Sequence, residues 1–317
     1  MARILVTGGA GFIGSHIAEA LVKDGNEVTI LDDLSTGSEK NLNGFKSKVK
    51  FVKGSITDRN LLAELTNNTD VIFHEAAQIS VVESIKHPGK TWEINIRGTK
   101  LLLNAAVNAK VKRVIFASSA AVYGRAQPPL HEGIVSKPTS NYGDSKRMGE
   151  MLMREYYEKE KLETVSLRYF NVYGPRQNPA SPYSGVISIF AKALAEGKNP
   201  TIFGNGMQTR DFVYIDDVVK ANILAMKSKK AVGNVFNVGT GKQVTVLDLL
   251  GIMKKKMKTE VEAEFSQTRP GDIMYSYADM KKSKETLGFE AETDLENGLE
   301  RTLEWIKKWQ DSLEQTG

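Results

Sequence analysis

The feature that most constrains the fold is a repeated alternation of short apolar segments with helical patterns over the first half of the chain. The apolar segments are nearly continuous, as in RILVTGG, EVTILDD, DVIFHEAA and KRVIFASS. Strands with this character are buried on both faces and occur in parallel sheets that helices cover on both sides. With right-handed crossovers, the pattern predicts an α/β fold with a doubly wound parallel sheet.

The pattern changes after about residue 170. Three prolines between residues 175 and 182 interrupt the chain, and shorter strands and helices follow. We therefore expect residues 1–170 to form the sheet domain, with 211–240 returning to it. Residues 171–317 are expected to form mainly a smaller α/β lobe that closes over the carboxyl edge of the sheet.

The composition excludes several classes of protein. The 317 residues include no cysteine, which rules out disulfides and thiolate sites and leads us to expect a cytoplasmic protein. There is no apolar run of about 18 residues and no signal-peptide pattern, so no membrane association is expected. The four histidines lack metal-ligand spacing, so no metal is expected. The net charge of +5 forms no nucleic-acid-binding tract.

A glycine-rich turn, VTGGAGFIG, links the first strand to the first helix and contains Gly8, Gly11 and Gly14. Such glycines allow a tight turn, a close approach of the backbone to a pyrophosphate and close packing of helix on strand. Asp32 ends the next strand, where a carboxylate accepts from a ribose 2′-hydroxyl and repels a 2′-phosphate. The turn therefore predicts a Rossmann-type site for NAD rather than NADP; the alternative is a glycine turn without a ligand.

A tyrosine and a lysine stand one helical turn apart in YGDSK, so Tyr142 and Lys146 lie on one helix face. Ser119 ends the strand KRVIFASS, at the sheet edge where ligands bind in open α/β folds. A free tyrosine, with a pKa of about 10, is a poor base at neutral pH. A lysine ammonium and the charge of an oxidised nicotinamide both favour the phenolate. We predict Tyr142 as base, Lys146 as tuning cation and Ser119 as hydrogen-bond partner of the reacting oxygen, although alone the pair could be helix surface.

Together with HEAA, NIRGT, SSAAVYG and RYFNVYGPRQ, these motifs resemble the extended short-chain dehydrogenase/reductase superfamily. The closest resemblance is to its UDP-glucose 4-epimerase family, from about residue 2 to about residue 310. The resemblance implies that the catalytic triad is Ser119, Tyr142 and Lys146. It implies that NAD is bound by Gly8, Gly11, Gly14, Asp32, Asn95, Tyr142 and Lys146. It also implies that the UDP-sugar is bound by Ser119, Asn171, Arg210, Arg269, Asp272 and Ser276.

Chemistry agrees with these assignments, because the planar, always charged guanidinium of arginine suits a diphosphate. One position departs from the family pattern. The family usually has Gly-Asp after the third strand, with the carboxylate near adenine, whereas this chain has KGSITD. The adenine contact would then be weaker or come from Asp58, and we assign neither Ser55 nor Asp58 to the site.

The resemblance also narrows the reaction. Related dehydratases carry an acid pair where Ala120 and Ala121 stand, and related epimerase-reductases and 3,5-epimerases use a cysteine, which this chain lacks. What remains is a 4-epimerase, in which NAD oxidises C4 and the transient 4-keto sugar turns before the hydride returns. Enzymes restricted to glucose and galactose tend to have a bulky aromatic at the position of Ser276. We therefore expect UDP-glucose/UDP-galactose interconversion and also that of UDP-GlcNAc and UDP-GalNAc.

Two other functions stay open at this point. UDP-glucuronate 4-epimerases and decarboxylases share most of these motifs, and a non-catalytic NAD-binding scaffold is a remote possibility. The resemblance further implies a homodimer. Helices expected over 92–108 and 142–161 would pair across a two-fold axis as a four-helix bundle.

Overall fold

The computed structural model describes residues 1–179, 185–268 and 273–314, with side chains as far as residue 311. Arg269 and Asp272, which the sequence assigned to the substrate site, lie outside the described residues.

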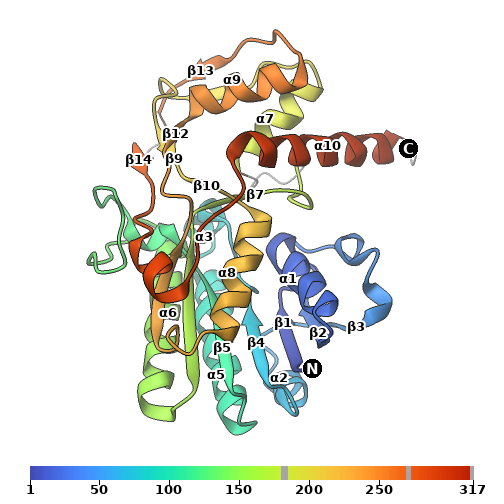
Figure 1. The fold of residues 1–317 in the computed structure, drawn as a ribbon, viewed down its shortest axis with the longest axis vertical. Coiled ribbons are helices and arrows are strands. Elements are labelled where there is room, and N and C mark those ends of the chain that lie inside the picture. The colour runs from blue at the N-terminus through green and yellow to red at the C-terminus, as the bar shows by residue number, and fades with distance from the viewer. Residues whose placement is uncertain (180–184, 269–272, 315–317) are drawn as a thin grey trace.

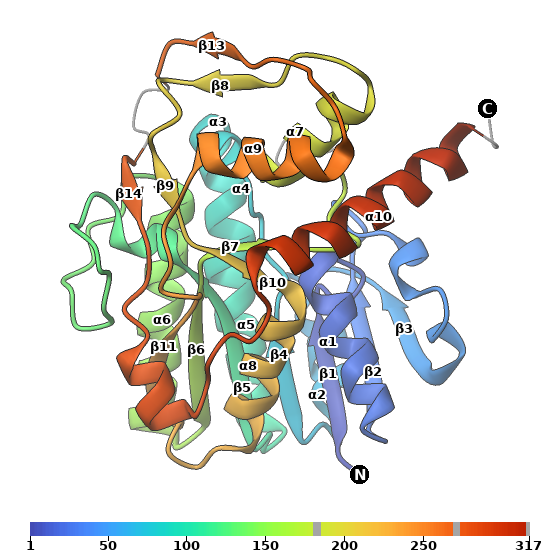
Figure 2. The ribbon, with the colours of Figure 1, turned by 45° about the horizontal axis from the view of Figure 1, so that its top comes forward.

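Seven parallel strands form one sheet in the order β11-β6-β5-β4-β1-β2-β3 (Figure 1, with β6 and β11 labelled in Figure 2). The chain starts at β1 and winds outward first to β3 and then to β11, which is the doubly wound order. The predicted α/β fold with a parallel Rossmann sheet is therefore confirmed. The strands are β1 (Arg3–Thr7), β2 (Glu27–Asp32), β3 (Val49–Lys53), β4 (Val71–His74), β5 (Arg113–Ser119), β6 (Glu163–Tyr169) and β11 (Asn234–Val238).

Alternate residues of a strand face opposite layers of helices. In β1, Ile4 and Val6 pack into one apolar cluster with α1 and α8, whereas Leu5 packs into a second cluster with α2, α5 and α6. Both faces of the sheet are thus buried, which is why its strands have continuous apolar sequences. These helices are α1 (Phe12–Lys23), α2 (Arg59–Thr66), α5 (Thr99–Asn108), α6 (Asn141–Glu160) and α8 (Ile215–Lys227).

A smaller lobe lies over the carboxyl ends of the strands, above the sheet in Figure 2. In it, β10 pairs with β7, β9 lies between β12 and β14, and β13 pairs with β8. Its strands are β7 (Asn171–Tyr173), β8 (Thr201–Phe203), β9 (Thr209–Arg210), β10 (Phe212–Tyr214), β12 (Val244–Thr245), β13 (Glu264–Ser266) and β14 (Tyr275–Ser276). Its helices include α7 (Val186–Ala195), α9 (Val246–Met257) and α10 (Leu295–Glu314).

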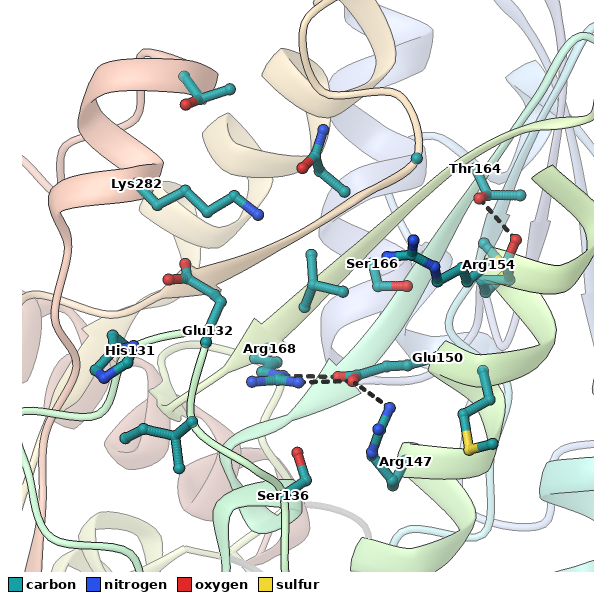
Figure 3. Close-up of a pocket in the computed structure, with 18 of the residues that line it drawn as sticks. His131, Glu132, Ser136, Arg147, Glu150, Arg154, Thr164, Ser166, Arg168 and Lys282 are labelled. Carbon is teal, nitrogen blue, oxygen red and sulfur yellow. Dashed lines mark hydrogen bonds and ion pairs between the residues drawn. The ribbon is translucent and has the colours of Figure 1, made fainter. Parts of the chain in front are cut away.

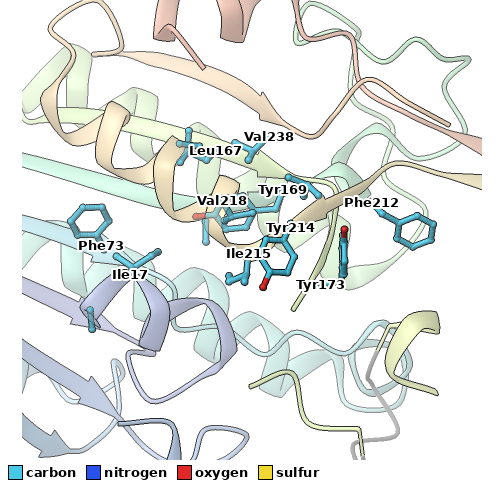
Figure 4. Packing of buried hydrophobic residues seen from close by; sticks show 14 of the residues in the cluster. Ile17, Phe73, Leu167, Tyr169, Tyr173, Phe212, Tyr214, Ile215, Val218 and Val238 are labelled. Atoms are coloured by element: carbon cyan, nitrogen blue, oxygen red, sulfur yellow. The ribbon is translucent and has the colours of Figure 1, made fainter. Parts of the chain in front are cut away.

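The lobe and the sheet share one apolar core (Figure 4). The ring of Tyr173 meets those of Phe212 and Tyr214 edge to face, with centroids 6.4 and 5.5 Å apart, in the same cluster as Ile17. The chain crosses back through this region, because β11 completes the sheet and α8 packs on α1. These positions of α8 and β11 are consistent with the expected return of residues 211–240 to the sheet domain. The domain boundaries themselves remain a prediction.

The helix expected over 92–108 is divided in the structure. After α4 (Pro88–Trp92) the chain forms a π-helical segment, η3 (Glu93–Gly98), before α5 begins. Gly98 packs so tightly that a Cβ there would lie 2.8 Å from the Cδ1 atom of Ile56. Sequence periodicity does not report such a contact between distant segments. The remaining short helices are α3 (Val81–Lys86), η1 (Glu39–Leu42), η2 (Lys46–Lys48), η4 (Ala120–Tyr123) and η5 (Ser283–Leu287).

Within residues 1–179, 185–268 and 273–314, no helix is long and apolar enough to cross a bilayer. In the same part of the chain, no group of three or more His, Asp or Glu side chains could hold a metal ion.

Candidate active site

The glycine turn after β1 leaves no room for side chains. Gly8 has a φ of +68°, and a Cβ there would lie 2.7 Å from the backbone nitrogen of Ala76. A Cβ on Gly14 would lie 2.3 Å from the carbonyl oxygen of Gly8. Gly11 donates its N–H to the same oxygen at 3.0 Å and precedes the first residue of α1. The turn therefore opens a backbone cradle at a helix N-terminus, which favours a pyrophosphate.

Asp32 ends β2 beside this cradle. Its carboxylate accepts the N–H groups of Ala10 at 2.9 Å and Leu34 at 2.8 Å. Burial raises the pKa of Asp32, and these backbone hydrogen bonds act in the opposite sense. The carboxylate thus holds the glycine turn in place while it lines the pocket described next.

One pocket at the carboxyl edge of the sheet joins the cofactor and catalytic predictions. It is lined by Gly8, Gly11, Gly14, Asp32, Tyr142 and Lys146. The same pocket is lined by Glu75, Gln78 and Tyr169, which the sequence did not single out. The buried Oε1 atom of Gln78 has no hydrogen-bond partner within the described chain. A glycine cradle and an acceptor without a partner fit the phosphates and hydroxyl groups of a dinucleotide such as NAD.

Tyr142 and Lys146 both enter this pocket from the first two turns of α6. The Ser119 hydroxyl lies close enough to the Tyr142 phenol to act on its pKa, and the Lys146 ammonium lies 5.9 Å from the centroid of the tyrosine ring. The three groups that the sequence predicted as a triad are therefore together. The N-cap Ser140 accepts from the N–H of Gly143 at 3.1 Å, which starts α6 in the right place.

Two effects on the pKa of Tyr142 oppose each other. Burial raises it above its ordinary value, and the nearby Ser119 hydroxyl acts in the opposite sense. Lys146 is itself buried, donates to the carbonyl of Ala117 at 2.6 Å, and has a pKa lowered by burial to about 8. Burial is the largest effect on the pKa of Tyr142. Of the two charges in the sequence argument, that of an oxidised nicotinamide is the one left to lower the tyrosine pKa.

Asn95 lies on η3 behind the pocket rather than in its lining. Its Oδ1 accepts from the N–H of Gln78 at 2.7 Å, and its Nδ2 donates to the Gln78 carbonyl and to Ser145 Oγ, both at 2.9 Å. The side chain therefore ties the pocket loop to the catalytic helix. A direct contact of Asn95 with NAD stays a prediction.

Ser55 and Asp58, which stand where the sequence departs from the family pattern, have different positions in the structure. Ser55 lines the cofactor pocket, and its hydroxyl lies 2.9 Å from Thr57 Oγ1. Asp58 instead caps α2, because its Oδ1 accepts from the N–H groups of Asn60 and Leu61 at 3.0 and 3.1 Å. A carboxylate used in this way is a helix cap, so of these two residues Ser55 is the one that lines the pocket.

The predicted substrate residues continue outward from Ser119. In the sheet, Ser119 lies opposite Tyr169, and Asn171 follows two residues later. The backbone and side-chain N–H groups of Asn171 both donate to the carbonyl of Asp211 at 3.0 Å. Asn171 is thereby anchored directly beside Arg210, the residue before Asp211.

Arg210 and Ser276 are register partners in neighbouring strands of the lobe. The Nη1 atom of Arg210 donates to the carbonyls of Thr209 and Ile273, at 2.9 and 2.7 Å. The guanidinium is therefore held at the strand pair that carries Ser276. None of Asn171, Arg210 and Ser276 is among the residues that line the cofactor pocket.

A larger hollow of about 1160 Å³ lies on the other side of α6, beside β6 and β11 (Figure 3). Its floor holds Arg168 and Glu150, a buried ion pair with two N–O distances of 2.8 Å. Ser118 donates to the same carboxylate at 2.6 Å. Since this hollow contains no residue of the predicted site, we read the pair as a support for α6 and β6.

Comparison with known proteins agrees with this geometry. The chain matches the NAD dependent epimerase/dehydratase family over residues 4–239. A UDP-glucose 4-epimerase of Mycolicibacterium smegmatis is 38% identical over 310 residues, covering 96% of this chain and 98% of its own.

Two solved structures have the same fold. One is a UDP-glucose 4-epimerase of Thermotoga maritima with UDP-glucose, and the other is a UDP-N-acetylglucosamine 4-epimerase of Methanobrevibacter ruminantium in complex with UDP-N-acetylmuramic acid. Each has a TM-score of 0.93 and 38% identity, and the match covers 97% of this chain and 99% of the other. By its sequence match, its doubly wound sheet and its glycine cradle beside a tyrosine–lysine pair, the chain belongs to the NAD dependent epimerase/dehydratase family.

Proposed function

We propose that the protein is an NAD-dependent 4-epimerase of UDP-sugars that works through a transient 4-keto sugar. The observation that carries the proposal is the pocket that holds Tyr142 and Lys146 beside the glycine cradle, with the Ser119 hydroxyl near enough to the tyrosine to act on its pKa. Relatives that share nearly the whole chain are named as UDP-glucose or UDP-N-acetylglucosamine 4-epimerases. Ala120 and Ala121 provide no acid or base for water elimination.

The proposed site residues have two kinds of role, in cofactor binding and in proton transfer. NAD, when bound, supplies the acceptor and donor of the hydride at C4. Gly8, Gly11, Gly14, Asp32 and Asn95 are its predicted binding residues, together with Tyr142 and Lys146. Tyr142 takes the proton of the O4 hydroxyl and later returns it, and Ser119 hydrogen-bonds the same oxygen.

Epimerisation also requires that the keto sugar turn, so that C4 presents its other face. This turn is possible when the diphosphate is held firmly and the sugar loosely. Asn171 and Arg210, with Arg269 and Asp272 outside the described residues, are the proposed UDP contacts. Arg210 supports this role because backbone carbonyls hold its guanidinium in place next to Ser276.

The range of sugars is proposed from Ser276. Its small side chain, half-buried on β14, leaves space where a bulky aromatic would restrict the substrate to glucose and galactose. We therefore include UDP-GlcNAc and UDP-GalNAc among the substrates. The neighbour from M. ruminantium, named for an N-acetylated sugar, supports this choice.

The test is proton NMR of purified protein supplied separately with UDP-glucose, UDP-N-acetylglucosamine and UDP-glucuronate, first without and then with added NAD. The expected result is the C4 epimer of the first two sugars without added NAD, because the cofactor stays bound through the cycle. If no C4 epimer of any of the three sugars forms even with NAD, the proposal is wrong.

UDP-glucuronate is the second candidate substrate. A UDP-glucuronate 4-epimerase of Thermodesulfobacterium geofontis is 32% identical over 97% of this chain. In the same NMR experiment, epimerisation of UDP-glucuronate alone would identify this activity, and loss of C6 as CO₂ would identify a decarboxylase. A non-catalytic scaffold would bind NAD and leave all three sugars unchanged.

We also propose a homodimer in which α5 and α6 of two subunits form a four-helix bundle. Met148 and Met151 are 37% and 56% exposed and lie three residues apart on one face of α6, which gives a partner helix an apolar surface to cover. Light scattering should give twice the chain mass, and Met151→Glu should give a monomer. A wild-type monomer at micromolar concentration would contradict the dimer, and the cytoplasmic location stays a prediction.

A further inference from the structure

A carboxylate that the proposed reaction does not use lies in the catalytic pocket. Glu75 follows β4 directly and lines the same pocket as Tyr142 and Lys146. Its position is fixed at both ends. Its backbone N–H donates to the Thr7 carbonyl at 3.1 Å, and its Oε1 accepts from the Tyr169 hydroxyl at 3.0 Å. The side chain is therefore part of the pocket wall rather than a free surface group.

The hydroxyl of Tyr169 is oriented by a second partner. The Nδ2 atom of Asn222, a buried residue of α8, donates to the Tyr169 oxygen at 2.8 Å. The Oδ1 atom of Asn222 also lies 3.2 Å from the phenol oxygen, but Glu75 Oε1 is nearer at 3.0 Å and its carboxylate is the stronger acceptor, so the phenol directs its single proton toward Glu75. This arrangement holds the carboxylate at a defined place next to the catalytic helix.

The groups that face Glu75 come from three elements. Tyr142 and Lys146 extend from α6, Tyr169 from β6, and the uncharged Asn222 from α8. The preceding residue, His74, is turned into the sheet, where its ring nitrogens lie 2.8 Å from Thr7 Oγ1 and 2.9 Å from Thr99 Oγ1. Burial lowers the pKa of His74 to about 3, so it is neutral. Lys146 is the cation that interacts with Glu75 in the described pocket wall.

The electrostatic effects of this arrangement are mutual. Burial raises the pKa of Glu75 to about 7, while the Tyr169 hydrogen bond and Lys146 act to lower it. The charge of Glu75 in turn acts to raise the pKa of Lys146, against burial, and to raise that of Tyr142. Glu75 therefore stabilises the ammonium and opposes the phenolate.

We propose that Glu75, held by Tyr169, is a positioning residue that sets the pH range in which Tyr142 and Lys146 are catalytically competent. Its carboxylate offsets the lysine charge that would otherwise act on the tyrosine. Loss of the Glu75 charge makes Tyr142 easier to ionise and Lys146 easier to deprotonate. Both changes move the working range to lower pH.

The test is the pH profile of kcat for C4 epimerisation in the wild type and in Glu75→Gln, which keeps the shape and hydrogen-bonding capacity of the side chain. We expect the alkaline limb, where Glu75 is ionised, to move to lower pH by about one unit, as for the loss of one neighbouring charge. The acid limb should move in the same direction by less, because Glu75 becomes protonated in the wild type near pH 7. A lower rate with unmoved limbs would mean a merely structural role and would overturn the proposal.

A second variant tests the hydrogen bond that holds the carboxylate. Tyr169→Phe removes the donor, so Glu75 binds its proton more tightly and stays neutral to higher pH. We expect both limbs to move in the same direction as in Glu75→Gln, by a smaller amount. The matched control is Glu64→Gln, which removes one exposed carboxylate on α2, and its profile should coincide with that of the wild type.

The inference rests on the proposed function, because that function assigns proton transfer to Tyr142. A measurement without substrate tests the inference about Glu75 separately from the proposed function. With NAD present, the ultraviolet difference between each protein and its Tyr142→Phe version reports ionisation of this one phenol. The midpoint should be lower in Glu75→Gln than in wild type, even if no UDP-sugar is turned over. An unchanged or higher midpoint would refute the role of Glu75 while leaving an observed epimerase activity intact.

Discussion

Arg168 on β6 binds the carboxylate of Glu150 on α6 through two hydrogen bonds of 2.8 Å, and both side chains are almost completely buried. Glu150 stands one helical turn after Lys146, so this ion pair holds the catalytic helix on the strand that leads to Asn171. The pair joins the two elements whose ends form the proposed site.

Removal of one partner of this ion pair should therefore destabilise the folded protein. We expect Arg168→Met to lower the free energy of unfolding by about 3 kcal/mol, because it leaves the buried Glu150 charge with only Ser118 and a longer 3.9 Å pair with Arg147. Chemical denaturation followed by circular dichroism measures the change. The control is Arg154→Gln, which breaks an exposed pair with Glu158 and should cost less than about 1 kcal/mol. Equal losses in the two variants would contradict a special role for the buried pair.

Tyr142→Phe should abolish most of the catalysis without loss of the cofactor. The phenylalanine keeps the ring in the pocket and removes the hydroxyl that transfers the proton, so kcat should fall by about 10²–10⁴-fold. NAD affinity, measured by calorimetry on cofactor-stripped protein, should change little. A variant that epimerises at the wild-type rate would show that another group transfers the proton.

Gly14→Ala should damage the cofactor cradle. The added Cβ would lie 2.3 Å from the carbonyl oxygen of Gly8, so the turn must shift away from its present position. We expect a loss of about 1–3 kcal/mol in stability, as for an overpacked site, and weaker NAD binding. The control is Gly251→Ala on α9, where a Cβ meets nothing within 4 Å, and helix propensity predicts a gain of about 0.5–1 kcal/mol. Unchanged NAD affinity in Gly14→Ala would argue against the cradle.

His16 should make the protein less stable as the pH falls. Burial lowers its pKa from 6.5 to about 4, and Arg176 acts in the same direction. Between these two values the unfolded chain binds a proton that the folded chain does not, so acid favours unfolding, by up to about 1.4 kcal/mol per pH unit. His16→Gln removes this pH-dependent contribution. The amount by which its free energy of unfolding falls below that of the wild type should therefore decrease from pH 7 to pH 5. Parallel stability curves for the two proteins would be inconsistent with this titration.

Ser276→Tyr should narrow the range of sugars. A tyrosine on β14, beside Arg210, would fill the space proposed for the N-acetyl group. We expect kcat/KM for UDP-N-acetylglucosamine to fall at least tenfold, as a steric conflict of about 1.4 kcal/mol or more would produce. The value for UDP-glucose should change little and serves as the internal control. Intact turnover of the N-acetylated sugar would show that Ser276 does not control access.

Much of the site was predictable because its signals are local in the sequence. The Gly8–Gly14 turn, Asp32 at the end of a strand and the Tyr142–Lys146 spacing each depend on a few neighbouring residues. Periodicity likewise reports the strands and helices, because side-chain burial repeats along each element. These local patterns were enough to identify the fold and the cofactor.

The tertiary structure decided what depends on contacts between distant segments. Glu75 meets Tyr169 across 94 residues of sequence, and only this pairing turns a carboxylate after β4 into a partner of Lys146. In the same way, Asn95 is the tie between Gln78 and Ser145. Burial is also a property of the folded molecule. Burial raises the pKa of Tyr142, an effect that the spacing of Tyr142 and Lys146 does not report.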